Sequence, residues 1–322
     1  MADIKLAPAV QTLLDQVNEL FPGTVMVQFG DKHAGYVRDD QVEQHVLKDR
    51  LLIWVDDITA PQYSAAHELS HLLMLLQGFP QIEFNLTFGD DELDEQLMAM
   101  STQLFNIVNH VVIFPALAGH GLIDDKVSDE FYNGIFATID PEPETGAEDD
   151  AQNALRLLVL LDALVFYGEG ISKHEKELST NFPKTYAAAK KLYDVMMAKK
   201  INTPFEVRRA LVRLYKAFDA QLTDWGLPAL NSTAFTTVTS VLSERQLRLE
   251  MRQMFEIFHS DLKDKESGER AYVALNRSDR QNAFVMTPPK EDADSSSFFK
   301  EVYDTPVKDF LEAHNISYIV RD

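Results

Sequence analysis

Two histidines four residues apart, His67 and His71, stand in the sequence His-Glu-Leu-Ser-His inside an apolar stretch. On an α-helix, positions i and i+4 lie on the same face one turn apart, so both imidazoles can reach a single metal ion. Zinc binds imidazole nitrogen and, in catalytic sites, keeps one of its four coordination positions for water. The spacing therefore predicts a zinc site to which both histidines contribute.

Glu68 directly follows the first of these histidines. A water molecule bound to zinc loses its proton near neutral pH. An adjacent carboxylate can accept that proton and pass it to a leaving amine. We therefore predict that Glu68 is the general base, and then the general acid, of a hydrolytic reaction.

The same motif also has a purely structural interpretation. It fixes only three positions in five, and two histidines on a helix can form a hydrogen-bonded pair in the core. The run from residue 61 to residue 77 is apolar on most sides and contains Ala65, Ala66, Leu69, Leu72, Leu73, Leu75 and Leu76. Ionisable side chains in such a helix are costly unless a partner satisfies them, and a metal ion is such a partner. We therefore favour the metal site.

Composition narrows the classes of function. The chain has 322 residues, no cysteine and a formal net charge of −21. Without cysteine there are no disulfides, thiolate ligands or cysteine nucleophiles, and a strongly negative field disfavours nucleic acid or an anionic membrane as the main partner. The N terminus lacks the pattern of a signal peptide, and the longest apolar run, residues 155–167, is too short to span a membrane. We expect a cytoplasmic protein.

The elements around the motif indicate an α+β fold. Apolar residues at helical spacing predict a helix over residues 7–21, which Pro22 and Gly23 end. Strands are predicted over residues 24–29 and 51–55. The helix that carries the histidines follows the second strand.

This order of elements, with Ala-Ala-His-Glu-Leu-Ser-His at residues 65–71, resembles the zincin metallopeptidases. It is most similar to the small prokaryotic gluzincin-like peptidases of the phage-repressor-degrading and radiation-response type, over roughly the first 120 residues. The resemblance implies a zinc-dependent peptidase acting on a protein or peptide. It also implies that the strand before the metal helix, residues 51–55, forms the edge of the cleft and receives substrate as an added strand.

A third zinc ligand is expected on the next helix, predicted over residues 92–114, where two residues qualify. Glu95 lies 24 positions after His71 and His110 lies 39 positions after it. The two are about 22 Å apart along a helix, so both cannot bind one ion. A simple hairpin of helices, and the glutamate that related peptidases supply from this helix, favour Glu95.

Burial favours His110 instead. Glu95 stands among several acidic residues, as at a solvated helix start. His110 stands in an apolar run together with Asn106 and Asn109, where polar side chains need partners. We therefore predict that His110 is the third ligand and that the two asparagines orient it. The alternative is a hydrogen-bond network in the core.

Other candidate residues are less specific. His120, Tyr132 and Tyr167 can each donate to a developing oxyanion, and nothing in the sequence selects among them. A group of basic side chains fits the outer face of an amphipathic helix better than a nucleic-acid patch. This group consists of Arg208, Arg209, Arg213 and Lys216.

Three regions are predicted along the chain. Residues 1–139 form the zincin-like module, and Pro115 is expected to end its long helix. An acidic, proline-rich loop over residues 140–150 leads to a helical region, residues 151–265. Within this region helices are predicted over residues 151–167, 186–199, 205–222 and 241–262. Residues 266–322 form a small α/β unit, with a polar loop over residues 292–297.

The leading hypothesis is a cytoplasmic zinc metallopeptidase with His67, His71 and His110 as ligands and Glu68 as general base. One alternative is a non-enzymatic binding or regulatory protein that retains a zincin-like module, because the C-terminal part matches no peptidase pattern. Another is a zinc hydrolase that acts on a non-peptide amide, which the same chemistry would serve.

Overall fold

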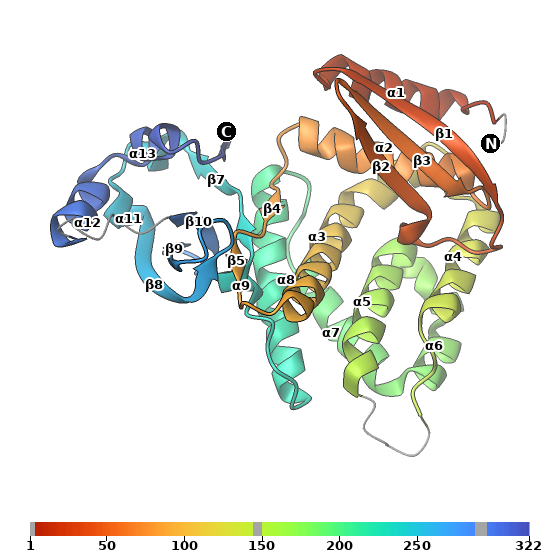
Figure 1. Ribbon diagram of the computed structural model, residues 1–322. Helices are drawn as coiled ribbons and strands as arrows, with labels where there is room; N and C mark the ends of the chain where they lie inside the picture. The colour runs from red at the N-terminus through yellow and green to blue at the C-terminus, as the bar shows by residue number, and fades with distance from the viewer. Residues whose placement is uncertain (1–3, 144–149, 287–294, 322) are drawn as a thin grey trace. The chain divides into compact units, whose positions relative to one another are not determined.

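The computed structural model describes residues 4–143, 150–286 and 295–321 of a mixed α+β protein (Figure 1). The chain divides into two compact units. Unit 1 consists of Met1–Gly78 and Asn109–Tyr193, and unit 2 of Phe79–Val108 and Asp194–Asp322. Residues 79–108 therefore group with the C-terminal part of the chain, and the predicted divisions after residues 139 and 265 do not coincide with the ends of these units.

Unit 1 begins with four predicted elements and one strand, residues 42–47, that was not predicted. Helix α1 (Pro8–Leu20) is followed by strands β1 (Thr24–Lys32), β2 (Val42–Leu47) and β3 (Arg50–Asp57), and then by helix α2 (Pro61–Leu76). Both helices begin at a proline, which is favourable in a first turn because its missing N–H has no partner there. Gly78, with a φ of +77°, lies just after α2, where few other residues adopt that conformation.

The sheet of unit 1 has the order β1-β3-β2. Strand β3 pairs in parallel with β1 and in antiparallel with β2. The prediction that residues 51–55 form the free edge of the cleft is therefore wrong, because both edges of β3 are already hydrogen-bonded. Strand β2 is an edge strand of this sheet, and its residues are almost all exposed.

Helix α3 (Asp91–Gly119) extends past the predicted end at Pro115. A proline inside a helix costs about 3 kcal/mol because it loses one backbone hydrogen bond and crowds the preceding turn. Here Phe114 and Leu117 on either side of it are buried, and their packing favours continuation. Of the described helices, α3 is long and apolar enough to cross a membrane by length and composition, and 56% of its most apolar window is buried inside the protein.

The rest of unit 1 is helical. It comprises α4 (Asp125–Thr138), α5 (Asp150–Tyr167), a 3₁₀ turn η2 (Gly168–Lys173), α6 (Glu175–Asn181) and most of α7 (Pro183–Met197). Helices α5 and α7 confirm predictions, whereas α4 and α6 were not predicted. The predicted loop over residues 140–150 falls largely on residues 144–149, which lie outside the described residues.

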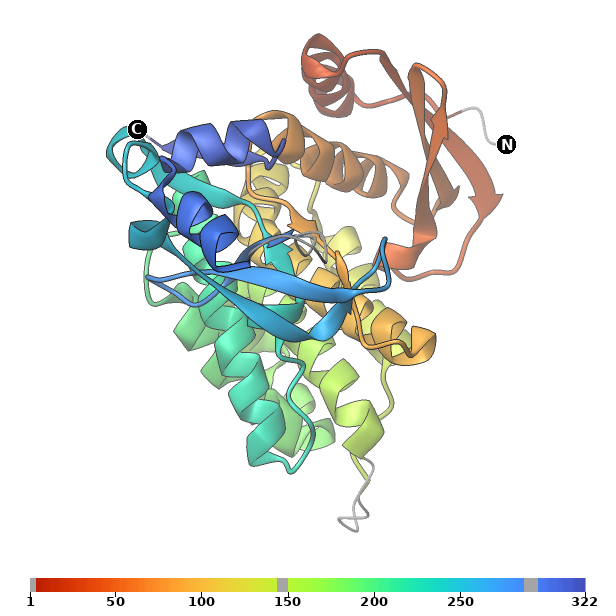
Figure 2. The ribbon, with the colours of Figure 1, turned by 60° about the vertical axis from the view of Figure 1, so that its left-hand side comes forward.

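Unit 2 combines one long helix with small sheets. Helix α8 (Pro204–Asp224) confirms a predicted helix. It begins with a capping box, in which Thr203 and Glu206 bond to each other's backbone N–H. A four-stranded sheet has the order β10-β9-β8-β5, and β8 and β9 run side by side in Figure 2. Its strands are β5 (Leu86–Thr87), β8 (Phe255–Asp264), β9 (Arg270–Asn276) and β10 (Asn282–Met286).

Two further strand pairs complete the sheets of unit 2. The pairs are β4 (Ile82–Glu83) with β6 (Thr237–Val238), and β7 (Ser240–Ser243) with β11 (Tyr318–Arg321). The short helices are α9 (Ser232–Phe235), α10 (Glu244–Leu247), α11 (Met251–Met254), α12 (Ser295–Asp304) and α13 (Val307–Ala313). Residues 295–297 of the predicted polar loop therefore begin α12, and residues 292–294 lie outside the described residues.

The prediction of a helix over residues 241–262 is wrong. The segment forms β7, α10, α11 and most of β8. Ser243 caps a new helix by accepting from the backbone N–H of Gln246, and Glu250 is extended, so no single helix passes through. Leu247, Met251 and Met254 are buried in one core all the same, but successive short elements bring them there. Phe258 is exposed.

The group of basic residues on α8 also differs from its prediction. Arg208 is buried and forms an ion pair with Asp279, so it does not lie on an outer face. Arg209 and Arg213 donate to backbone carbonyl groups of Lys200 and Met196. These contacts tie the side chains of Arg209 and Arg213 to the backbone that precedes α8.

Candidate metal centre

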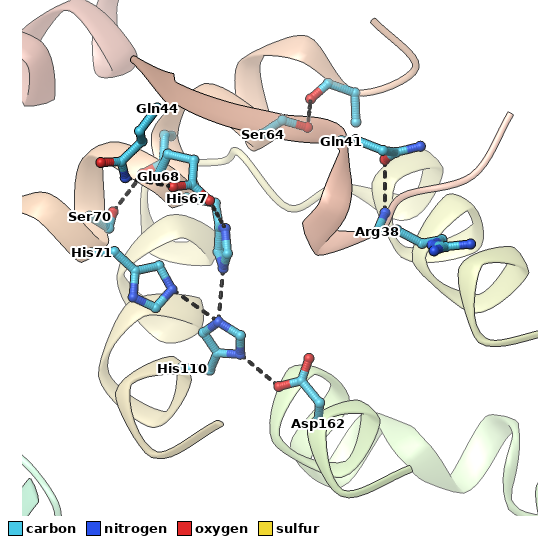
Figure 3. A network of polar contacts seen from close by, with 12 residues as sticks. Arg38, Gln41, Gln44, Ser64, His67, Glu68, Ser70, His71, His110 and Asp162 are labelled. Carbon is cyan, nitrogen blue, oxygen red and sulfur yellow. Dashed lines mark hydrogen bonds and ion pairs between the residues drawn. The ribbon is translucent and has the colours of Figure 1, made fainter. Parts of the chain in front are cut away.

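Helix α2 presents His67 and His71 one turn apart in unit 1 (Figure 3). His67 is buried and His71 is half-buried. The helix lies against α1 and β3 and buries Ala65, Ala66 and Leu69 completely, which fixes the direction in which the histidine face points.

His110 on α3 completes a cluster of three imidazoles. Its Nε2 atom lies 2.9 Å from Nε2 of His67 and 3.1 Å from Nε2 of His71. Three nitrogen atoms that converge in this way can hold one metal ion. Imidazole is a ligand for zinc, copper, iron and nickel, so the donor set fits a transition metal and not magnesium or calcium.

Asp162 on α5 contacts Nδ1 of His110, the ring nitrogen that does not face the other two histidines. Its Oδ1 atom lies 2.6 Å from Nδ1 of His110, and both side chains are buried. A carboxylate at this place keeps the proton on Nδ1 and leaves the lone pair of Nε2 facing the other two histidines. Such a carboxylate also makes the imidazole a more basic ligand.

The sequence did not identify Asp162 as part of the site. Its signal is that it is an acidic residue in the apolar run of residues 155–167. The predicted orienting groups, Asn106 and Asn109, do not take this role, because Nδ1 of His110 faces Asp162. The Oδ1 atom of Asn109 is buried without a hydrogen-bond partner among the described residues.

Aromatic side chains lie against two of the three imidazoles. The ring of Phe114 lies 4.4 Å from that of His110 and 6.0 Å from that of His67, and Tyr63 stacks on His67 at 5.8 Å. Burial, together with the neighbouring His67 and His110, holds the pKa of His71 well below its usual 6.5. Neutral imidazole is the form that binds metals.

Glu68 lies at the rim of this cluster. Its Oε2 atom accepts a hydrogen bond of 3.1 Å from Nε2 of Gln44 on β2, and its Oε1 atom lies 3.6 Å from Nδ1 of His67 (Figure 3). The side chain is 17% exposed. A carboxylate in this position has a protein partner on one oxygen and access to solvent.

The remaining candidates lie outside the cluster. Glu95 is exposed and belongs to the residues that group as unit 2. His120 is exposed, the hydroxyl of Tyr167 donates to the carbonyl of Ser128 at 2.6 Å, and the ring of Tyr132 stacks on His174 at 4.0 Å. The structure therefore selects none of these three as an oxyanion donor.

Comparisons with protein-family models, with curated proteins and with solved structures return no match to this chain.

Proposed function

We propose that this protein is a zinc-dependent peptidase whose zinc ligands are His67, His71 and His110. The observation that carries the proposal is the convergence of three Nε2 atoms, with Asp162 bonded to the rear nitrogen of one of them. Three histidine ligands that leave a fourth position open are characteristic of catalytic zinc sites. A purely structural role explains this arrangement less well, because the single lone pair on Nε2 of His110 can accept a well-directed hydrogen bond from only one of the other two imidazoles.

Zinc held by His67, His71 and His110 would activate a water molecule for attack and polarise a carbonyl oxygen. Glu68 is the general base in this proposal. Its carboxylate accepts the proton during attack and donates it to the leaving amine. Asp162 maintains the orientation of His110 throughout. The aromatic rings of Phe114 and Tyr63 shield the imidazoles of His110 and His67 from water.

The outer edge of β2 is the proposed binding place for the peptide. Edge strands present unpaired main-chain groups, and an extended peptide can add to them as a further strand. Strand β2 also carries Gln44, the hydrogen-bond partner of Glu68. A peptide on this edge would therefore lie close to the general base.

Metal analysis and peptide cleavage test the proposal together. Protein purified without added zinc should contain about one zinc per chain, which His71→Ala and His110→Ala lose and Glu95→Ala keeps. Glu68→Gln should retain zinc and lower the cleavage rate of a peptide library about 10²- to 10⁴-fold.

Different results would support different conclusions. No zinc uptake, even when zinc is supplied in excess, would show that the histidines are structural and would end the peptidase hypothesis. Zinc uptake without cleavage of any peptide would redirect the search to acyl-amide substrates or to a binding function. Cleavage at the wild-type rate by Glu68→Gln would contradict the role of Glu68.

A further inference from the structure

Gln44 connects the edge strand of the unit 1 sheet to Glu68. In the register of β2 with β3, Gln44 lies opposite Ile53. Residues directly opposite each other on paired strands project from the same face of the sheet. Ile53 is fully buried, so Gln44 faces the layer that contains α2. Its neighbours Glu43 and His45 project from the other face, where Nε2 of His45 lies 3.2 Å from Oε2 of Glu43.

The contact between Gln44 and Glu68 is a hydrogen bond to the carboxylate. The amide Nε2 of Gln44 donates to Oε2 of Glu68 at 3.1 Å (Figure 3). The other carboxylate oxygen lies 3.6 Å from Nδ1 of His67, which is too long for a hydrogen bond. Within the described residues, the side-chain hydrogen bond that holds Glu68 therefore comes from β2.

We propose that Gln44 is a positioning residue that holds the Glu68 carboxylate in place beside the metal centre. The inference rests on the proposed function of Glu68 as general base. A general base must lie within about 3 Å of the proton it accepts, and a misplacement of about 1 Å can lower a rate about 10²-fold. A partly exposed glutamate without an anchor distributes over several rotamers, and Gln44 selects one of them.

If the same hydrogen bond had only a structural role, its loss would lower stability and leave the catalytic rate per folded molecule unchanged. Gln44 is exposed and Glu68 is partly exposed, and hydrogen bonds between such groups contribute little to stability. In the positioning role proposed here, loss of the hydrogen bond between Gln44 and Glu68 should lower the catalytic rate and leave folding and zinc binding intact.

The test compares Gln44→Leu with Gln11→Leu. Gln11 on α1 makes the same kind of contact away from the site, since its Nε2 donates to Oδ1 of Asp15 at 2.8 Å on an exposed surface. We expect Gln44→Leu to keep one zinc per chain, a Tm within about 2 °C of wild type and a KM within about twofold. Its kcat should fall about 10- to 100-fold. Gln11→Leu should match the wild type in all four quantities.

Crystal structures of the wild type and of Gln44→Leu give a readout that does not need activity. A Glu68 carboxylate that leaves its wild-type position in Gln44→Leu supports the inference, and one that stays there overturns it. An unchanged kcat also overturns it, as does a fall in zinc content or Tm that accounts for the lost rate. If the wild type binds zinc but cleaves no peptide, the proposed function fails, and the crystal structures alone decide whether Gln44 positions Glu68.

Discussion

The three-histidine cluster of unit 1 and the ion pair of unit 2 both place a carboxylate against nitrogen atoms, but they satisfy it differently. In unit 2, Asp279 faces the guanidinium of Arg208, and the two opposite charges compensate each other. In unit 1, Asp162 faces only the rear nitrogen of His110, and the front nitrogens of three imidazoles face one another.

This difference separates an arrangement that is complete within the protein from one that, in our proposal, binds a metal ion. A buried pair of opposite charges is complete within the protein, although it is not always more stable than an apolar replacement. Nε2 of His110 has a single lone pair and can accept a well-directed hydrogen bond from only one of the other two imidazoles, so a metal ion would satisfy all three nitrogens better than they satisfy one another. Changes in unit 2 should therefore affect stability, and changes in unit 1 should affect metal binding.

The largest effect on stability should come from Asp279→Asn. This change leaves the guanidinium of Arg208, only 5% exposed, without its counter-charge. Removal of one partner from a buried pair costs about 3–5 kcal/mol. Because Asp279 itself is 24% exposed, we expect about 2–4 kcal/mol here. Urea unfolding measures this loss, and zinc content should not change.

The controls for this prediction use a surface pair and a double variant. Glu175→Gln breaks the exposed pair of Lys190 and Glu175, which are 2.6 Å apart, and should cost less than about 1 kcal/mol. The double variant Arg208→Met with Asp279→Asn should regain part of the lost stability, because no buried charge remains unpaired. A loss of zinc from Asp279→Asn would remove the distinction between the two regions.

Asp162→Asn should have a smaller effect, confined to metal binding. The neutral amide makes His110 a weaker ligand and no longer fixes the proton on Nδ1. We expect zinc affinity to fall about 10- to 100-fold, as measured by competition with a chelator. Asn109→Ala is the matched control, and its zinc affinity should equal that of the wild type. Equal losses in both variants would mean that Asp162 has no special role.

Local patterns account for what the sequence could predict in unit 1. The i, i+4 spacing of His67 and His71 determines their common helix face without any tertiary contact. His110 was also predictable, because a polar residue in an apolar helix needs a partner wherever the helix packs. The placement of Asp162 against His110 was not, because the two residues are 52 positions apart and their pairing depends on how α3 and α5 pack.

Strand β2 and residues 241–262 show why other predictions failed. Strand β2 is exposed along most of its length, so it lacks the alternation of polar and apolar residues by which strands are recognised, and Gln44 was not identified with it. Leu247, Met251 and Met254 have helical spacing because two short helices carry them. The cap at Ser243 and the extended backbone at Glu250 divide the segment, and the spacing of apolar residues does not reveal either. In both segments tertiary pairing overrides the local pattern.

Asp219 in unit 2 extends the comparison to a carboxylate held by backbone N–H groups. Its Oδ1 accepts from the backbone N–H of Leu230 at 2.9 Å, and burial raises its pKa to about 6. The folded state therefore keeps the proton at a pH where the unfolded chain has lost it. Stability should fall as the pH rises from about 4 to about 6, and the loss should persist above that range.

Asp219→Asn should remove this pH dependence, because the amide oxygen still accepts from Leu230 and carries no charge. The difference in unfolding free energy between variant and wild type should move in favour of the variant by about 1–2 kcal/mol from pH 4.5 to pH 7. Urea unfolding at both pH values measures it, and other carboxylates cancel in the difference. A difference that is the same at both pH values would show that backbone N–H groups satisfy a buried carboxylate as completely as Arg208 satisfies Asp279.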